Sequence, residues 1–246
     1  MKAFRLIGMA LVAVLVCVNI SSCGKDVDVS MVAGNFADQK RLVKMEGTEV
    51  YNLNAAPQEF CITFDYNDQG QVVEVVSGNY SDKYVWENNT IKTSAVYESL
   101  EYTTTYVLVN GLVRQIIQES PYGSDKETLP YNKNGRYIGY DIEWDGDKIV
   151  QYFSGDYMYT PENYTTCSKG YFPLLDSEDT LCMAHPEIFG MRTTQLPVDY
   201  ILTDCCTDRQ YTGTYEYEFD SEGYITKIVN TLDYGNKQSV YFLTWE

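Results

Sequence analysis

The most informative stretch of the chain is Tyr215-Glu216-Tyr217-Glu218-Phe219-Asp220-Ser221-Glu222-Gly223-Tyr224-Ile225. Aromatic and acidic side chains alternate over its first five residues, which is the two-residue period of a strand with one buried face and one wet face. A polar turn with a glycine follows, and glycine readily supplies the positive φ angles that tight turns need. The stretch therefore predicts a β-hairpin.

The same pattern of an aromatic strand end, a polar turn and a second alternating strand recurs earlier in the chain. The earlier copies occupy residues 64–73, 84–91, 106–113, 131–138 and 144–150. Six such hairpins imply on the order of a dozen strands, and a sheet that wide must curl because its strands twist. Long helical periodicity is missing from the sequence, which argues against α/β crossovers. We predict an all-β fold, an antiparallel meander of about a dozen strands curled into a half-barrel or barrel.

The chain resembles Bacteroidetes lipoproteins of unknown function whose domain is described as porin-like in fold. The resemblance rests on the opening strand Lys40-Arg41-Leu42-Val43-Lys44-Met45, on the repeated hairpins, which are of the YD type, and on Phe189-Gly190-Met191-Arg192-Thr193-Thr194-Gln195-Leu196-Pro197. It covers most of residues 40–246, which we expect to form a single β domain. The family implies a fold and a location, but no activity, ligand or catalytic residue.

The N-terminus has the layout of a secretion signal. Lys2 and Arg5 precede an apolar run that is too short to span a bilayer, and Ile20-Ser21-Ser22-Cys23 resembles the lipoprotein box. We predict a signal peptide over residues 1–22, lipidation of Cys23 and a tether over residues 23–39. Gly24 in place of aspartate favours the outer membrane by resemblance to a sorting rule. The periplasmic face and the cell surface both stay open.

Five cysteines remain after Cys17 in the signal peptide and the anchor Cys23 are set aside. Four of them lie where the repeated hairpin pattern stops, so we predict a small insert over residues 156–210. We expect one or two disulfides to cross-link this insert, and their connectivity is open. The candidate disulfide residues are Cys167, Cys182, Cys205 and Cys206. The fifth, Cys61, lies in an apolar strand and is expected to be a buried thiol. Within the insert, a short helix is expected to end near His185, and residues 198–203 read as a strand.

The amino-acid composition excludes several classes of partner and of enzyme. The chain has 35 acidic and 18 basic residues, a net charge of -17 and a single histidine. Nucleic acid is an improbable partner because phosphate binding needs clusters of Lys and Arg. A lone His185 three residues after Cys182 is a poor zinc site, so we predict no metal and no cofactor. A serine or cysteine hydrolase would have to use the same histidine, and the chain contains no nucleophile-elbow motif.

We expect a non-enzymatic envelope protein that binds a glycan or an envelope protein, or acts as a scaffold. Aromatic side chains stack on sugar rings as well as they pack a core. Candidate platform residues are Tyr84, Trp86, Tyr106 and Trp144, together with Tyr102 and Tyr152. Asp179-Thr180-Leu181 resembles an acceptor for O-glycosylation at Thr180. One alternative is an enzyme that cleaves glycans or peptidoglycan with two carboxylates in a β cleft, and another is a structural subunit or adhesin.

Overall fold

The computed structural model describes residues 40–246 except 51–55, 98, 140–141, 174–178 and 235–236. The predicted signal peptide, the lipidation site Cys23 and the tether lie outside the described residues. The described strands are β1 (Leu42–Glu49), β2 (Gln58–Tyr66), β3 (Val72–Ser77), β4 (Tyr80–Glu87), β5 (Thr90–Tyr97), β6 (Leu100–Val109), β7 (Leu112–Ser120), β8 (Gly123–Thr128), β9 (Ile142–Asp145), β10 (Lys148–Ser154), β11 (Tyr157–Thr166), β12 (Gln195–Asp204), β13 (Arg209–Phe219), β14 (Ile225–Leu232) and β15 (Lys237–Trp245). One short helix, α1 (Thr180–Ala184), joins them.

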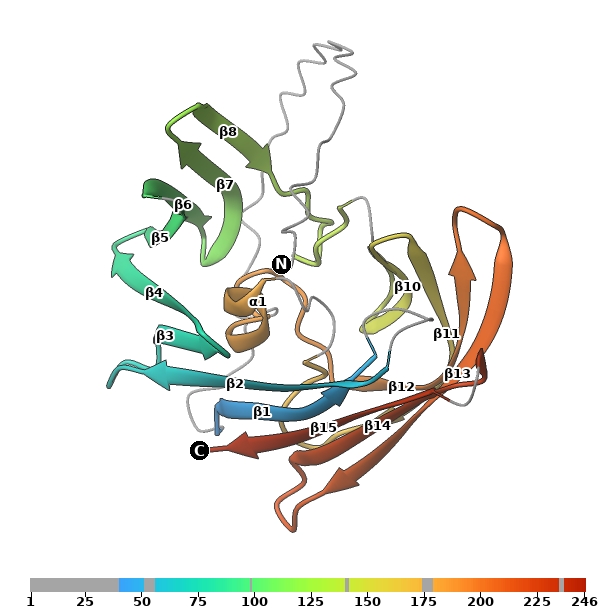
Figure 1. Ribbon diagram of the computed structural model, residues 1–246. Coiled ribbons are helices and arrows are strands. Elements are labelled where there is room, and N and C mark those ends of the chain that lie inside the picture. Colours follow the sequence, from blue (N-terminus) through green and yellow to red (C-terminus); the bar gives the residue numbers. More distant parts are fainter. Residues whose placement is uncertain (1–39, 51–55, 98, 140–141, 174–178, 235–236) are drawn as a thin grey trace.

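All fifteen strands form one sheet in the order β8-β7-β6-β5-β4-β3-β2-β1-β15-β14-β13-β12-β11-β10-β9. The first and last strands meet in its middle, where β1 pairs antiparallel with β15. The chain runs outward from β1 to one edge at β8, crosses to the other edge at β9, and returns to the centre. Figure 1 shows the sheet curving around α1. The prediction of an all-β antiparallel meander is confirmed, and the sheet is open because β8 and β9 do not pair.

Most of the predicted hairpins form as expected. Tight turns with positive φ join β2 to β3 at Gly70 (φ 76°) and β13 to β14 at Gly223 (φ 94°). The predicted hairpin at residues 131–138 is confirmed only as a turn, which is closed by an isolated antiparallel bridge between Tyr131 and Tyr137 and is not flanked by strands of the sheet. The Tyr131 hydroxyl donates to the carbonyl of Val113 at 2.6 Å, so the stretch folds onto β7 and does not extend the sheet.

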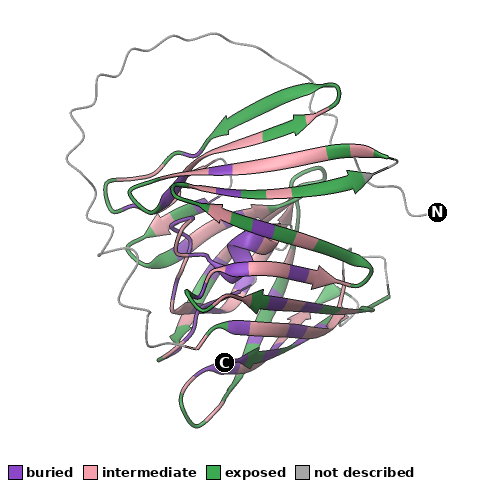
Figure 2. Ribbon diagram, turned by 90° about the vertical axis from the view of Figure 1, so that its left-hand side faces the viewer, coloured by how far each residue is buried: buried purple, intermediate pink, exposed green. Residues whose placement is uncertain are grey.

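The core lies on the concave face of the sheet. Along β15 the side chains of Tyr241, Leu243 and Trp245 are buried, whereas Phe242 between them is exposed. This face is covered by residues 167–173 and 179–194, which together we name the interior segment and which include α1 (Figure 2). Its buried apolar side chains are Cys167, Tyr171, Phe172, Leu181, Cys182, Met183, Ala184, Phe189 and Met191. Fully burying one large apolar side chain contributes roughly 1.5–3 kcal/mol, so this segment completes the core.

The predicted insert is shorter than residues 156–210, because β11 and β12 lie within that range and continue the meander. Two register shifts around Asn163 interrupt the pairing of β11 with β12. They also interrupt the two-residue alternation of buried and exposed side chains by which a strand is recognised in a sequence. The predicted helix is α1, with Asp179 as its N-cap, and it ends at His185. The predicted strand at residues 198–203 lies within β12.

The described residues form no disulfide bond, so the predicted cross-link is not observed. Cys167 and Cys182 are buried in the interior segment, whereas Cys205 and Cys206 are exposed in the turn beyond the far end of β12. A ten-residue strand, which spans roughly 30 Å, therefore separates the two exposed cysteines from the interior segment. Cys61 is exposed, not buried as predicted, because its neighbour Ile62 takes the core-facing position in β2. No described helix has the length and hydropathy needed to cross a membrane.

Candidate functional site

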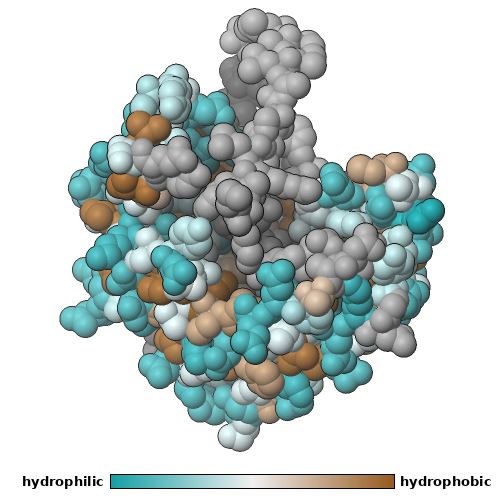
Figure 3. Space-filling model, viewed as in Figure 1, coloured by the Kyte–Doolittle hydropathy of each residue, from teal (hydrophilic) through white to brown (hydrophobic). Residues whose placement is uncertain are grey.

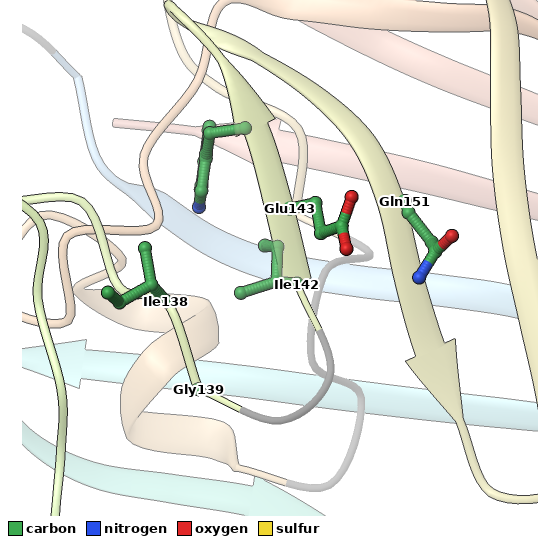
Figure 4. A pocket seen from close by; sticks show the side chains of 6 residues that line it. Ile138, Gly139, Ile142, Glu143 and Gln151 are labelled. Atoms are coloured by element: carbon green, nitrogen blue, oxygen red, sulfur yellow. The ribbon is translucent and has the colours of Figure 1, made fainter.

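A pocket of about 380 Å³ lies along the edge strand β9 (Figure 4). It is lined by Ile138, Gly139, Ile142, Glu143, Trp144 and Gln151. Figure 4 shows Glu143 and Gln151 on adjacent strands, while Ile138 and Ile142 lie on the other side of β9. The volume falls within the range of about 300–1,000 Å³ that small-molecule sites occupy.

The position of β9 at the edge of the sheet creates this pocket. Strand β9 pairs with β10, and Glu143 lies directly opposite Gln151 in that pairing. Side chains alternate between the two faces of a strand, so Glu143 projects away from the core side that Ile142 occupies. The pocket lining therefore draws on both faces of β9, with the polar side chain of Glu143 on one and the apolar side chain of Ile142 on the other.

Trp144 is held in place by two neighbours from the preceding stretch. Its indole Nε1 donates to the carbonyl of Tyr137 at 2.7 Å. The guanidinium of Arg136 lies 4.7 Å from the ring centroid, a distance typical of a cation–π contact. Arg136 is fixed in turn by an ion pair with Asp147 at 2.5 Å. A tryptophan restrained on two sides is a pre-organised wall that loses little conformational freedom when a ligand binds.

The pocket chemistry suits a neutral molecule with several hydroxyl groups. The carboxylate of Glu143 accepts hydrogen bonds, and the amide of Gln151 both donates and accepts them. Ile138, Ile142 and Trp144 offer apolar surface for the carbon skeleton. Glu143 is the one carboxylate among the residues that line this pocket, whereas glycoside hydrolysis uses two.

Four other predicted platform residues, Tyr84, Trp86, Tyr106 and Tyr152, take part in packing the concave face. Tyr84 and Tyr106 are 6% and 7% exposed. The Tyr84 hydroxyl is 2.8 Å from Oγ1 of Thr180, and the indole of Trp86 donates to the carbonyl of Val72 at 2.8 Å. Tyr152 and Tyr102 are likewise outside the pocket lining, and Trp144 is the predicted platform residue that lines it. Glycosylation of Thr180 stays a prediction, and in the folded chain it would have to break the contact with Tyr84.

A chain of stacked tyrosines covers the inner face of strands β10 to β13. The rings of Tyr152 and Tyr159 are nearly parallel with centroids 4.6 Å apart, and Tyr159 and Tyr200 follow at 5.3 Å. Burial, with a smaller contribution from Glu49, raises the pKa of Tyr159 to about 12. These phenols therefore stay protonated at neutral pH and donate hydrogen bonds, as Tyr200 does to Asn230 at 2.7 Å. The cluster contributes packing and hydrogen bonds, not a titrating group.

Sequence reasoning did not foresee the role of the single histidine. The backbone N–H of Val72 donates to Nε2 of His185 at 3.1 Å. Nδ1 must therefore carry the proton, and it lies 2.7 Å from the carboxylate of Glu187. The rings of Tyr66 and Trp86 contact the imidazole edge-on, with centroids 5.8 and 5.4 Å away. The histidine links the interior segment to β3, and among the described residues no group of three or more metal-binding side chains is found.

Acid is expected to weaken this link. Burial acts to raise the pKa of Glu187, but its interactions with His185, the backbone and Arg192 outweigh that effect and hold the pKa below its usual value. A carboxylate with a lowered folded-state pKa stabilises the fold above its unfolded-state pKa, and this contribution is lost as pH falls through the folded-state pKa. We expect Glu187→Gln to lose less stability than the parent chain between about pH 5 and pH 3. Urea unfolding at several pH values measures this difference.

The exposed carboxylate of Glu216 in β13 provides the control for the acid experiment. Glu216→Gln should leave the pH dependence of stability close to that of the parent chain. If Glu187→Gln and Glu216→Gln give the same acid profile, the coupling between Glu187 and His185 does not contribute to acid sensitivity.

Comparison with solved structures places the fold among porin-like proteins of Bacteroides. A porin-like protein from Bacteroides uniformis matches with a TM-score of 0.55 and 15% identity over 83% of this chain and 96% of its own. A second porin-like protein, from Bacteroides vulgatus, matches with a TM-score of 0.26 and 12% identity over 82% of this chain and 87% of its own. No protein-family profile matches this sequence, and no curated protein does either. The likeness to the Bacteroides uniformis protein is one of fold.

Proposed function

We propose that this chain is a non-enzymatic protein, anchored to the outer membrane through lipid on Cys23, that binds a glycan in the β9 pocket. The observation that carries the proposal is the pocket itself, whose lining includes Trp144 together with the polar pair Glu143 and Gln151. An aromatic wall next to a carboxylate and an amide matches the two surfaces of a sugar, which has apolar C–H faces and a rim of hydroxyls.

A binding role agrees better with this arrangement than hydrolysis does. The pocket lining contains one carboxylate, and a second at about 5–9.5 Å would be needed for either mechanism of glycoside hydrolysis. The concave face of the sheet is a less suitable site, because the interior segment covers it and buried rings such as Phe172 and Tyr215 contact each other there. A ligand could reach that face only if the interior segment moved.

The binding proposal predicts a large effect at Glu143. Residues 24–246 should bind one or more neutral oligosaccharides from a panel in isothermal titration calorimetry, and Glu143→Ala should weaken binding by roughly 10- to 100-fold. This range corresponds to the loss of about 1.5–3 kcal/mol for a hydrogen bond to a charged group. Glu216→Ala, which removes an exposed carboxylate from β13, is the matched control and should bind like the parent chain.

The outcomes separate the three functional classes. Unchanged affinity in Glu143→Ala and in a Glu143→Ala/Gln151→Ala double variant would reject the pocket as the glycan site. Shortened oligosaccharides after incubation would favour the hydrolase. Ordered self-assembly in solution without any glycan binding would favour the structural subunit or adhesin.

The anchor proposal has its own test. In a bacterial host that lipidates exported proteins, the full-length chain should fractionate with the outer membrane, and Cys23→Ser should move it to the soluble fraction. Several acyl chains hold a soluble domain at a bilayer because each buried methylene contributes roughly 0.8 kcal/mol. Cys61→Ser, at an exposed cysteine of the folded domain, is the control and should stay in the membrane fraction. Antibody labelling of intact and permeabilised cells then assigns the face.

A further inference from the structure

The meander places successive turns alternately at two opposite rims of the sheet. We name the rim where β1 begins the anchor rim, because the described chain enters the fold there. The chain is held at this rim by the backbone N–H of Glu246, which donates to the carbonyl of Arg41 at 2.9 Å, and by the backbone N–H of Lys40, which donates to the hydroxyl of Tyr224 at 2.8 Å. The opposite rim, which we name the distal rim, carries the turns between β3 and β4, β5 and β6, and β7 and β8.

Three exposed apolar side chains lie at these three turns. Tyr80 is 64% exposed, Val96 is 74% exposed and Tyr122 is 82% exposed, the highest values among the exposed large hydrophobic residues. Figure 2 shows the three turns one above another along its right-hand side. Neighbouring strands are about 4.8 Å apart, so successive turns are spaced by roughly 10 Å along the rim. Figure 3 shows apolar residues among hydrophilic ones over β4 to β8, at the upper left.

Two of the three apolar side chains on the distal rim, Val96 and Tyr122, have a carboxylate nearby in the fold. Val96 pairs directly with Glu101 across β5 and β6. Tyr122 lies in the turn between the strand residues Glu119 and Asp125, both of which are exposed. The distal rim of these strands therefore combines exposed apolar groups with negative charge.

The anchor rim of the same strands carries basic side chains as well as acidic ones such as Asp68 and Glu87. There the basic side chains include Arg41, Lys44, Lys92 and Arg114, and all four contact neighbours: Arg41 lies over the Tyr66 ring and Lys44 forms an ion pair with Glu46. Lys92 forms an ion pair with Glu87 at 3.0 Å, and the guanidinium of Arg114 lies 4.3 Å from the ring centroid of Tyr131.

We propose that the distal rim, formed by Tyr80, Val96 and Tyr122 with the carboxylates of Glu101, Glu119 and Asp125, docks a partner protein whose surface is rich in Lys and Arg. Exposed tyrosines are effective anchors at interfaces because they bury a large area with few rotatable bonds. Complementary charge steers association and excludes acidic partners. The inference concerns a second surface, separate from the β9 pocket. With the anchor at Cys23, the rim lies at the end of the sheet opposite the point where the tether joins it.

In-cell photocrosslinking of the full-length chain tests this proposal. The crosslinking amino acid p-benzoylphenylalanine replaces Tyr122 or Val96, and at the anchor rim it replaces Asn89 or Asn134, which are exposed turn residues. We expect the distal positions to crosslink one protein, identified by mass spectrometry, and the anchor-rim positions to leave it uncrosslinked. The absence of a crosslinked protein, or equal crosslinking from both rims, would overturn the proposal.

Binding of the purified partner to residues 24–246 then tests the chemistry. Affinity should fall at least about tenfold between 0.05 and 0.3 M salt, because screening weakens exposed charge pairs. It should fall similarly in Tyr122→Ser and in the charge reversal Glu119→Lys, whereas Glu143→Ala in the pocket should bind normally. Salt-independent binding, or capture of a second copy of this acidic chain, would reject a basic partner. Loss of binding in Glu143→Ala would move the site to the pocket.

Discussion

Replacing Phe172 with alanine is expected to lower the free energy of unfolding by about 3–5 kcal/mol, the usual cost of deleting a buried aromatic ring. Phe172 is 1% exposed, and its ring meets that of Tyr215 edge-on with centroids 5.6 Å apart. Its backbone N–H also donates to the carbonyl of Thr193 at 3.2 Å. Removing the ring leaves a cavity between the interior segment and the sheet, and chemical denaturation of residues 24–246 measures the loss.

Phe242→Ala is the matched control for the interior segment. Phe242 is 48% exposed on the convex face of β15, and the ammonium of Lys227 lies 6.0 Å from its ring centroid. We expect this variant to lose under about 1 kcal/mol, because surface substitutions away from special features cost little. Equal destabilisation of the two variants would mean that the interior segment is not part of the cooperative core.

Alanine at Gly190 is expected to destabilise the fold by about 1–3 kcal/mol more than alanine at Gly78, the usual cost of forcing extra atoms into a packed site. Gly190 has φ +65°, and an added Cβ would lie 2.2 Å from the carbonyl oxygen of Gly135. The position of the Cβ is set by the backbone of residue 190 and its partner is a backbone oxygen, so no side-chain rotation relieves the clash. The interior segment and the turn at residues 131–137 therefore depend on a glycine at this contact.

Gly78 separates the two costs of replacing such a glycine with alanine, which are the strained left-handed backbone and the steric clash of the added Cβ. It has φ +60° in the turn between β3 and β4, and an added Cβ meets nothing within 4 Å. Gly78→Ala thus carries only the penalty for a left-handed backbone, roughly 1–2 kcal/mol. Thermal unfolding of both variants gives the difference. Similar melting temperatures for the two variants would show that the turn moves away from residue 190 at little cost.

The interior segment also explains why the aromatic platform was predicted only in part. Alternation indicated correctly that one face of each strand is buried, but it did not say what covers that face. Tyr84 and Tyr106 lie against the start of α1, where their hydroxyls approach Thr180 and Asp179 at 2.8 and 3.5 Å. Trp144 also packs against the core, but on the edge strand β9 it lines the pocket as well. Glu143 and Gln151 carried no signal of their own, since the pairing of β9 with β10 brings them together.

The sequence by itself determined the features that depend on neighbouring residues. The two-residue alternation of Tyr215 to Phe219, the glycine turns at 70 and 223 and the N-cap of α1 at Asp179 are local, and each was predicted from a short stretch. Only the tertiary structure decided the pairing of β1 with β15, the open edges at β8 and β9, and the place of the interior segment on the concave face. These features depend on contacts between residues far apart in the chain, which local conformational preferences do not encode. The β9 pocket belongs to this second group, because it exists only where the meander ends.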